Sequence, residues 1–293
     1  MGKCPPRPDR FMHAELSAAS TPAPGWRPPL LVKASVAWHV GAGVATLALP
    51  AAWPWAIGAI ALNHAALIGL GVWPRSTWLD ANLVRLPAAA AERREIAITI
   101  DDGPDPEVTP RVLDLLDAAR VRATFFPIAR RAREHAALTR EIVRRGHSVQ
   151  NHTQEHPHAF SFYGMKRLAA EIGAAQQTLA DLTGTQPTFF RAPAGVRNPL
   201  LGPVLHRLGL RLVSWTRRGF DTIERRPERV LAKLGRALGP GDILLLHDGH
   251  AARAAAGTPV ILEVLPALLE QAARTNLAAV TLPHACAVEA HGA

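Results

Sequence analysis

Two histidines and an earlier pair of carboxylates are the residues best suited to chemistry in this sequence. His152 and His156 are four residues apart, so their imidazoles can point the same way if the segment forms a helical turn. Asp101 and Asp102 are adjacent and project to different sides of an extended chain, so one can bind a metal while the other faces water. Two histidines and one carboxylate predict a catalytic site for zinc or a similar divalent ion, with one coordination position open. Ordinary surface histidines, and turn chemistry before Gly103, are the alternatives.

Short apolar runs predict the elements that must position these residues. From Glu95 onward, β-branched or aromatic runs alternate with helical stretches, which is typical of βα units and a parallel sheet. Polar residues follow several of these runs, at the strand ends where α/β sites are assembled. The seven predicted strands are Ile96–Ile100, Ala123–Pro127, His147–Asn151, Thr188–Arg191, Arg211–Trp215, Asp242–Leu246 and Ala279–Leu282.

Four motifs in this region resemble those of the polysaccharide deacetylases, the NodB-like enzymes of carbohydrate esterase family 4. They are Thr99–Pro104 (TIDDGP), His152–His156 (HTQEH), Arg191–Gly195 (RAPAG) and Leu244–His247 (LLLH), and the resemblance extends from about Glu95 to Leu282. It implies an α/β fold, a distorted (β/α) barrel of seven strands. It also implies a hydrolase that removes the N-acyl (acetamide) group from an amino sugar in a polysaccharide or lipid-linked glycan.

The resemblance assigns a role to each of these polar residues. One divalent ion, expected to be Zn²⁺, is held by Asp102, His152 and His156. The general base is Asp101 and the general acid is His247. Arg191 pairs with the base carboxylate, and the backbone N–H near Ala194 stabilises the oxyanion.

The sequence departs from the family pattern at two places. Ala194 stands where the family usually has an aromatic residue, which opens the sugar-facing wall of the site. The family's motif of two Asp followed by Trp is not recognisable after Trp215, where Arg218 replaces the first Asp and Asp221 remains. We hypothesise that Asp221 keeps His247 charged and aimed. Trp215 and Arg218 are placed with Ala194 on the substrate side.

Two adjacent arginines raise the question of an anionic substrate. Arg217 and Arg218 at the rim of the site would suit a phosphate, because guanidinium forks match phosphate oxygens. Ordinary surface charge or a pair with Glu224 is the alternative. The histidines outside the motifs are expected to be structural or exposed. His147 points to the face of the third predicted strand opposite Gln150 and His152, and the others lack a carboxylate at ligand spacing: His158, His206, His250, His284 and His291.

The N-terminal third has the composition of a membrane segment. Residues 34–74 contain no Asp, Glu, Lys or Arg and can hold two crossings, Ala34–Leu49 and Trp55–Trp73. We therefore expect a transmembrane helical hairpin, with a single signal anchor or soluble Ala-rich helices as alternatives. Basic residues flank the run on both sides, which favours the inner (cytoplasmic) membrane with the catalytic domain on the cytoplasmic side.

The domain organisation follows from these patterns. We expect a disordered, Pro-rich basic leader (1–33), the hairpin (34–74), a linker (75–94) and the catalytic domain (95–293).

Composition limits the function classes. The chain has 293 residues, is 48% hydrophobic and carries a net charge of +9. It is too apolar to be disordered, and no nucleic-acid motif accompanies the charge, so a membrane is the expected partner and nucleic acid is not. Cys4 and Cys286 lie near opposite ends, which excludes a cysteine zinc site. A metal phosphodiesterase and an inactive glycan-binding membrane protein are the alternatives to a deacetylase.

Overall fold

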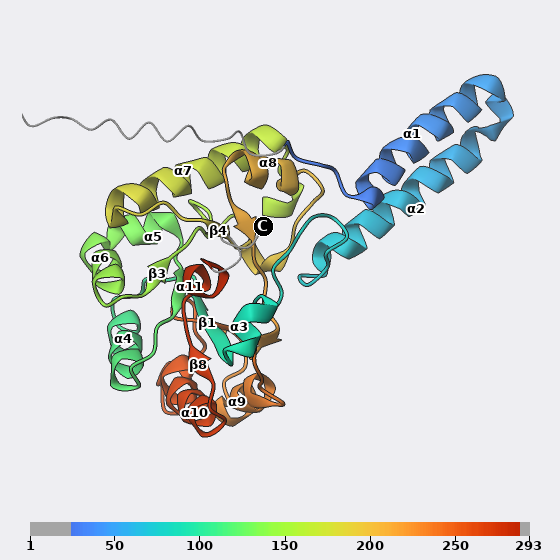
Figure 1. The fold of residues 1–293 in the computed structure, drawn as a ribbon. Coiled ribbons are helices and arrows are strands. Elements are labelled where there is room, and N and C mark those ends of the chain that lie inside the picture. The colour runs from blue at the N-terminus through green and yellow to red at the C-terminus, as the bar shows by residue number, and fades with distance from the viewer. Residues whose placement is uncertain (1–24, 288–293) are drawn as a thin grey trace, which may run out of the picture.

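A parallel sheet forms the centre of the molecule. The computed structural model describes residues 25–287, in which a helical hairpin is joined to an α/β domain (Figure 1). The main sheet has the strand order β3-β2-β1-β7-β6, and β8 pairs with β1. Every strand pairing is parallel. The strands of this sheet are β1 (Glu95–Asp101), β2 (Thr124–Phe126), β3 (Ser148–Val149), β6 (Arg217–Arg218), β7 (Ile243–His247) and β8 (Ala278–Ala279).

A second pair of strands extends this arrangement. The strands β4 (Phe189–Phe190) and β5 (Arg211–Leu212) pair in parallel, and a bridge between Asn151 and Phe190 joins them to the end of β3. The predicted α/β, barrel-like fold is confirmed. A strand lies at each of the seven predicted places, although the last one is only Ala278–Ala279 because Leu282 begins a helix, and β6 was not predicted.

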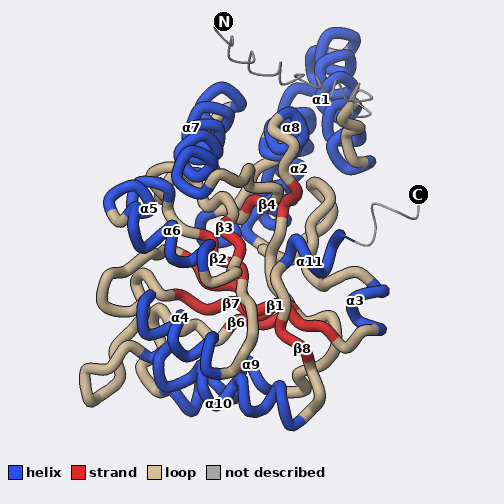
Figure 2. Tube along the Cα trace, turned by 60° about the vertical axis from the view of Figure 1, so that its left-hand side comes forward, coloured by secondary structure: helices blue, strands red, loops and turns tan. Residues whose placement is uncertain are grey.

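Helices cover the sheet on both sides (Figure 2). Alternate residues of β1 face opposite sides of the sheet, which decides the side on which Asp101 lies. Ile96, Ile98 and Ile100 pack in one apolar cluster with α4, α9 and α10, whereas Ala97 belongs to a second cluster on the opposite face. Asp101 shares the face of Ala97 because side chains alternate along a strand. The helices of the domain are α3 (Ala88–Glu92), α4 (Thr109–Ala118), α5 (Ala129–Glu134), α6 (Ala136–Arg144), α7 (Met165–Thr183), α8 (Leu201–Arg207), α9 (Pro227–Gly235), α10 (Val260–Arg274) and α11 (Leu282–Cys286).

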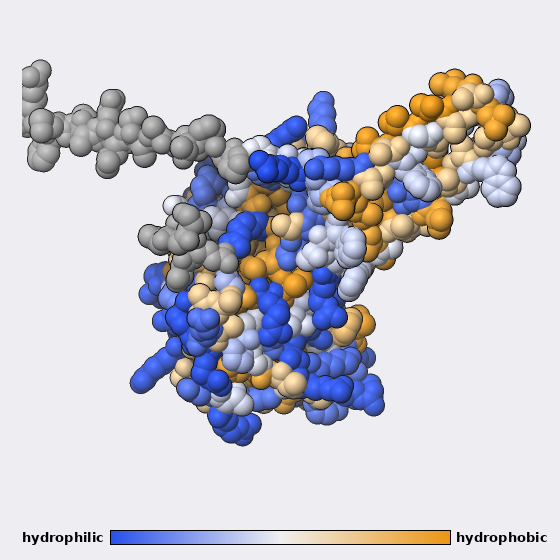
Figure 3. All heavy atoms as spheres, turned by 45° about the vertical axis from the view of Figure 1, so that its right-hand side comes forward, coloured by the Kyte–Doolittle hydropathy of each residue, from blue (hydrophilic) through white to orange (hydrophobic). Residues whose placement is uncertain are grey.

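The hairpin projects from the domain as an apolar arm (Figure 3). Its helices are α1 (Leu30–Ala48) and α2 (Trp53–Val72), joined by a 3₁₀ turn, Pro50–Ala52. Both helical segments are long and apolar enough to cross a membrane, with only 11% and 6% of their apolar windows buried. The two predicted crossings coincide with these helices.

Polar side chains near the middle of the two hairpin helices face one another. The Asn63 amide donates to the Ser35 hydroxyl at 2.9 Å, and the Nε2 atoms of His39 and His64 lie 3.2 Å apart. Some polar side chains of each helix therefore have partners on the other helix.

Residues 75–94 pack against the domain. Leu79, Leu86 and Ala90 are buried, and the Leu83 backbone donates to Leu212 and accepts from Ser214. The predicted disordered leader lies mostly outside the described residues, as do Cys4 and His291.

Candidate active site

The carboxyl ends of the strands bring the sequence-predicted residues into one pocket. Asp101 ends β1 and is the register partner of His247, which ends β7, so the two side chains start from the same edge and face. The cavity there has a volume of about 260 Å³. Among the residues that line it are Asp101, Asp102, His152, His156, Ala194, Trp215, Arg218 and His247.

The segment that contains the two histidines is a bent loop and does not form the helical turn that would align imidazoles four residues apart. Thr153 and His156 have φ values of 68° and 54°, in the left-handed region that helices avoid. The loop still brings the rings of His152 and His156 together, with centroids 4.8 Å apart. Asp102 (φ 73°) is also left-handed, and such conformations cluster at functional sites.

The donor atoms of Asp102, His152 and His156 fit a divalent cation. The Asp102 Oδ1 atom is 3.3 Å from His152 Nε2 and 3.5 Å from His156 Nε2. It is buried and has no hydrogen-bond partner among residues 25–287. The His152 Nδ1 atom donates to the Arg191 carbonyl at 2.8 Å, so in the neutral ring the lone pair is on Nε2, which faces the carboxylate. Acceptors that face one another in a buried site need a cation or a proton between them.

The pKa directions of Asp102 and His156 agree with this interpretation. Burial raises the pKa of Asp102, but its interactions with His152 and His250 outweigh burial and hold that pKa well below its usual range. Burial and the charge of His152 lower the pKa of His156 to about 4. At neutral pH the carboxylate is therefore ionised and His156 is neutral, as metal ligands require. Burial lowers the pKa of His152, but the charges of Asp101 and Asp102 outweigh burial and raise it, so a cation bound there would displace a proton.

His250 is a residue of the site that the sequence analysis missed. The side chain of Arg131 donates to His250 Nε2 at 2.7 Å, so Nδ1 carries the proton and faces Asp102 Oδ2 at 3.3 Å. Arg131 also donates to the Asp102 carbonyl at 3.0 Å. His250 is exposed, as expected, and its carboxylate partner lies 148 residues away in the sequence, which no search at ligand spacing finds.

The second carboxylate is held by a buried arginine. The Arg191 Nη1 atom donates to Asp101 Oδ1 at 2.7 Å and to the Thr99 hydroxyl at 2.8 Å, and Nη2 donates to the Ser214 carbonyl at 2.9 Å. The guanidinium also stacks on Phe126, 4.3 Å from the ring centroid. Asp101 is therefore fixed in position, with its other oxygen 3.9 Å from His152 Nε2.

A second ion pair flanks the pocket. Asp221 accepts from the His247 ring Nδ1 at 2.9 Å and from its backbone N–H at 2.7 Å. Burial lowers the pKa of His247, but the charges of Asp221, Asp101 and Asp102 together raise it above its ordinary value. The arrangement favours a charged imidazolium with a fixed direction.

The turn after the two carboxylates has no space for a side chain at Gly103. A Cβ atom at this position would lie 2.3 Å from Asp248 Oδ1. Asp248 is buried and accepts a hydrogen bond from the Thr109 hydroxyl at 2.5 Å, and burial raises the pKa of Asp248 to about 7. This carboxyl supports the loop rather than the pocket.

The pocket lining contains one of the two neighbouring arginines. Ala194 is left-handed, with φ 52°, and lines the pocket with Trp215 and Arg218. Arg217 points to the opposite side of β6, where its side chain donates to Asp242 at 2.5 Å and to the carbonyl groups that follow α9. The expectation that Arg217 lies at the rim is wrong.

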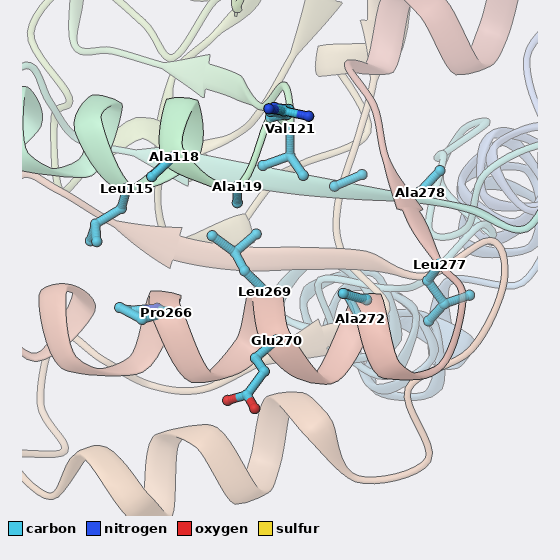
Figure 4. Close-up of a pocket in the computed structure, with 13 residues that line it drawn as sticks. Leu115, Ala118, Ala119, Val121, Pro266, Leu269, Glu270, Ala272, Leu277 and Ala278 are labelled. Carbon is cyan, nitrogen blue, oxygen red and sulfur yellow. The ribbon is translucent and has the colours of Figure 1, made fainter.

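An apolar groove elsewhere in the domain has no such chemistry. It lies between α4, α10 and β8, with a volume of about 550 Å³ (Figure 4). Leu115, Val121, Leu269 and Leu277 line it, and none of the predicted site residues does. The strand-end pocket is therefore the candidate active site.

Comparison with known proteins identifies the family. The family model for polysaccharide deacetylase matches residues 88–213. A chitooligosaccharide deacetylase of Azorhizobium caulinodans is 37% identical over 155 residues, which cover 53% of this chain and 73% of the relative. The chain belongs to the polysaccharide deacetylase family.

Further relatives agree with this assignment. A peptidoglycan-N-acetylglucosamine deacetylase of Bacillus cereus is 33% identical over 181 residues, covering 61% of this chain and 84% of the relative. The solved family 4 carbohydrate esterase of Streptomyces lividans, in complex with acetate, superposes with a TM-score of 0.57 at 30% identity, covering 63% of this chain and 91% of that one. The family resemblance inferred from the four motifs is confirmed, and so is the enzyme class, carbohydrate N-deacetylase.

Proposed function

We propose that this polysaccharide deacetylase is a metal-dependent, membrane-anchored enzyme that hydrolyses the N-acetyl group of an amino sugar in a polysaccharide or lipid-linked glycan. The observation that supports it most is the convergence of three donor groups beside two oriented ion pairs. Asp102, His152 and His156 would hold one divalent ion, with Zn²⁺ the expected metal. When bound, the ion would lower the pKa of a water molecule to about 7 and polarise the amide carbonyl.

The residues of the chain would supply the proton transfers. Asp101 accepts the proton of the attacking water, and Arg191 holds its carboxylate in place through the 2.7 Å ion pair. His247, kept protonated by Asp221, donates a proton to the departing amine. Each transfer contributes about a hundredfold to ten-thousandfold in rate. The products are acetate and the free amino sugar.

A backbone N–H group would stabilise the tetrahedral oxyanion. The backbone N–H near Ala194 would donate a hydrogen bond to the oxyanion. Ala194 has a left-handed conformation, so the backbone runs in an unusual direction at this point. Trp215, which lines the same pocket, would contact the sugar.

The hairpin would anchor the enzyme. Large apolar side chains of α1 and α2 are exposed, including Leu47 at 86% and Trp55 at 82%, and their burial in lipid would be favourable. Basic residues on both flanks support a position in the inner membrane with the catalytic domain in the cytoplasm. The proposed division of the chain is a leader (1–33), the hairpin (34–74), a connecting segment (75–94) and the catalytic domain (95–293).

Acetate release tests this function. The purified full-length protein in detergent is incubated with N-acetylglucosamine oligomers, and acetate, phosphate and free amine are measured. Acetate and amine are expected in equal amounts. Chelation should abolish their release, and Asp101→Asn should slow it by about a hundredfold or more. Phosphate release from phosphodiester substrates without acetate would instead identify a phosphodiesterase, and no product at all would indicate an inactive glycan-binding protein.

A further inference from the structure

The second hairpin helix ends on the wall of the catalytic pocket. The Arg197 N–H donates to the Gly71 carbonyl at 3.1 Å, and a Cβ at Gly71 would lie 2.3 Å from the Arg197 carbonyl oxygen. Three residues later, the Pro74 carbonyl accepts from the Ser214 hydroxyl at 2.6 Å. The end of α2 is thus joined directly to the catalytic domain.

Pro74 also touches a residue that lines the pocket. A Cβ at Gly195 would lie 2.8 Å from the Pro74 Cβ and 2.7 Å from the Trp215 ring, so these three residues are in close contact. Gly195 and Trp215 both line the cavity that contains the metal-binding cluster. Gly195 and the Trp215 ring therefore connect the pocket to Pro74, which lies two residues beyond the end of α2.

The same segment has features of a membrane interface. Trp73 and Trp78 are 51% and 60% exposed on either side of Pro74, and Arg75 between them is also exposed. Amphipathic indole rings and basic side chains at the end of an apolar span favour the headgroup zone. On the proposed anchoring, the phosphate groups of the membrane would lie near this wall of the pocket.

Inside the pocket, Arg218 is a cation with no anionic partner in the part of the chain that the structure describes. Its guanidinium lies 5.3 Å from the Trp215 ring centroid and 4.9 Å from that of Phe220. Its Nε atom is buried without a hydrogen-bond partner, and no carboxylate within residues 25–287 lies at ion-pair distance. Its neighbour Arg217 pairs with Asp242, so the lack of a partner is specific to the arginine that faces the site.

We propose that Arg218 binds the phosphate group through which the substrate sugar is attached to a membrane lipid. A guanidinium matches phosphate oxygens with two parallel hydrogen bonds, and the two aromatic rings would hold it in a fixed orientation. The substrate class is then a lipid-phosphate-linked N-acetylated amino sugar, which enters the pocket beside Pro74. This inference rests on the proposed function, because the acetamide of the same sugar must reach the metal-binding cluster.

Matched synthetic substrates test this inference. Full-length protein in lipid nanodiscs is given octyl N-acetylglucosaminide, the same glycoside with a phosphate between sugar and octyl chain, the water-soluble sugar 1-phosphate, and an octyl glycoside with a carboxylate in place of the phosphate. The variants are Arg218→Met, Arg218→Lys and, as a control, Arg140→Met, an exposed arginine of α6. The measured quantity is kcat/KM for acetate release.

The wild type and Arg140→Met are expected to prefer the phosphate-linked octyl substrate over the neutral one by about tenfold or more. Arg218→Met is expected to lose this preference, and Arg218→Lys to keep part of it. An equal rate on the neutral substrate, or a preference that survives Arg218→Met, would overturn the phosphate site and leave deacetylation intact. A preference for the carboxylate analogue or for the soluble sugar phosphate would overturn the lipid-phosphate assignment. Acetate from none of the substrates would overturn the proposed function together with this inference.

Discussion

Asp221 holds both the ring and the backbone of His247: one carboxylate oxygen lies 2.9 Å from Nδ1 and the other accepts the backbone N–H at 2.7 Å. The ring cannot rotate without breaking this pair. Because Asp221 is completely buried, its charge acts on the imidazole with little screening by solvent.

This pair predicts the alkaline limb of the pH profile. Burial lowers the pKa of His247 and its carboxylate neighbours raise it, with a net increase. A general acid must be protonated, so activity falls as the pH rises through this pKa. Asp221→Asn removes the charge, lowers the pKa and should move the alkaline limb to lower pH, with kcat reduced by about tenfold or more. The measurement is kcat against pH from 5 to 10, and an unmoved alkaline limb would exclude the orienting role.

Asp101→Asn should separate catalysis from metal binding. The amide oxygen can still accept from Arg191 Nη1, so the variant should fold, but an amide cannot take the proton of water. We expect kcat to fall about a hundredfold or more while metal content stays at the wild-type level. Metal content is measured by mass spectrometry of the purified variant. A variant that retains activity would rule out Asp101 as the base.

His250→Ala should weaken metal binding. Its Nδ1–H faces the Asp102 oxygen that is turned away from the histidine pair, and such outer contacts typically contribute about tenfold to a hundredfold in metal affinity. The Kd for Zn²⁺ is measured by competition with a chromophoric chelator, which needs no substrate. His158→Ala is the control, because His158 lines the same pocket and has no hydrogen bond to Asp102. Equal affinities for both variants would contradict the role of His250.

Metal binding should also stabilise the fold. Without a cation, the buried Asp102 Oδ1 has no hydrogen-bond partner. Saturating Zn²⁺ should therefore raise Tm, and the increase should depend on concentration because the ion binds only the folded state. Differential scanning fluorimetry after chelation and again after addition of Zn²⁺ measures this shift. His156→Ala should strongly reduce this increase in Tm. A wild-type Tm that changes neither on chelation nor on addition of Zn²⁺ would argue against the cation site.

The hairpin predicts behaviour in cells. The full chain should remain in the membrane pellet after an alkaline carbonate wash, because both apolar helices would be surrounded by lipid. A C-terminal fluorescent reporter that works only in the cytoplasm should be active, and a phosphatase reporter that works only outside the inner membrane should be inactive. The opposite pair of signals would place the catalytic domain on the other side. Release of the chain from the membrane by carbonate would contradict the proposed membrane anchor.

The sequence alone determined the fold class, the seven longer strand signals and the identity of the motif residues. These features depend on neighbouring residues: apolar runs mark strands, and motifs keep their order along the chain. The two-residue strand β6 escaped prediction because its residues, Arg217 and Arg218, have no apolar alternation and pair with β7 only through the backbone.

Tertiary structure decided what those residues contact. Arg217 and Arg218 look equivalent in the sequence, but the pleat of β6 sends one to Asp242 and the other into the pocket. His250 meets Asp102 from a position 148 residues away, which no local spacing rule can anticipate. Likewise, the contact of Pro74 with Gly195 depends on where the chain returns in space. Side-chain pairing between distant segments arises from packing of the whole sheet, and that information is not contained in any single stretch of sequence.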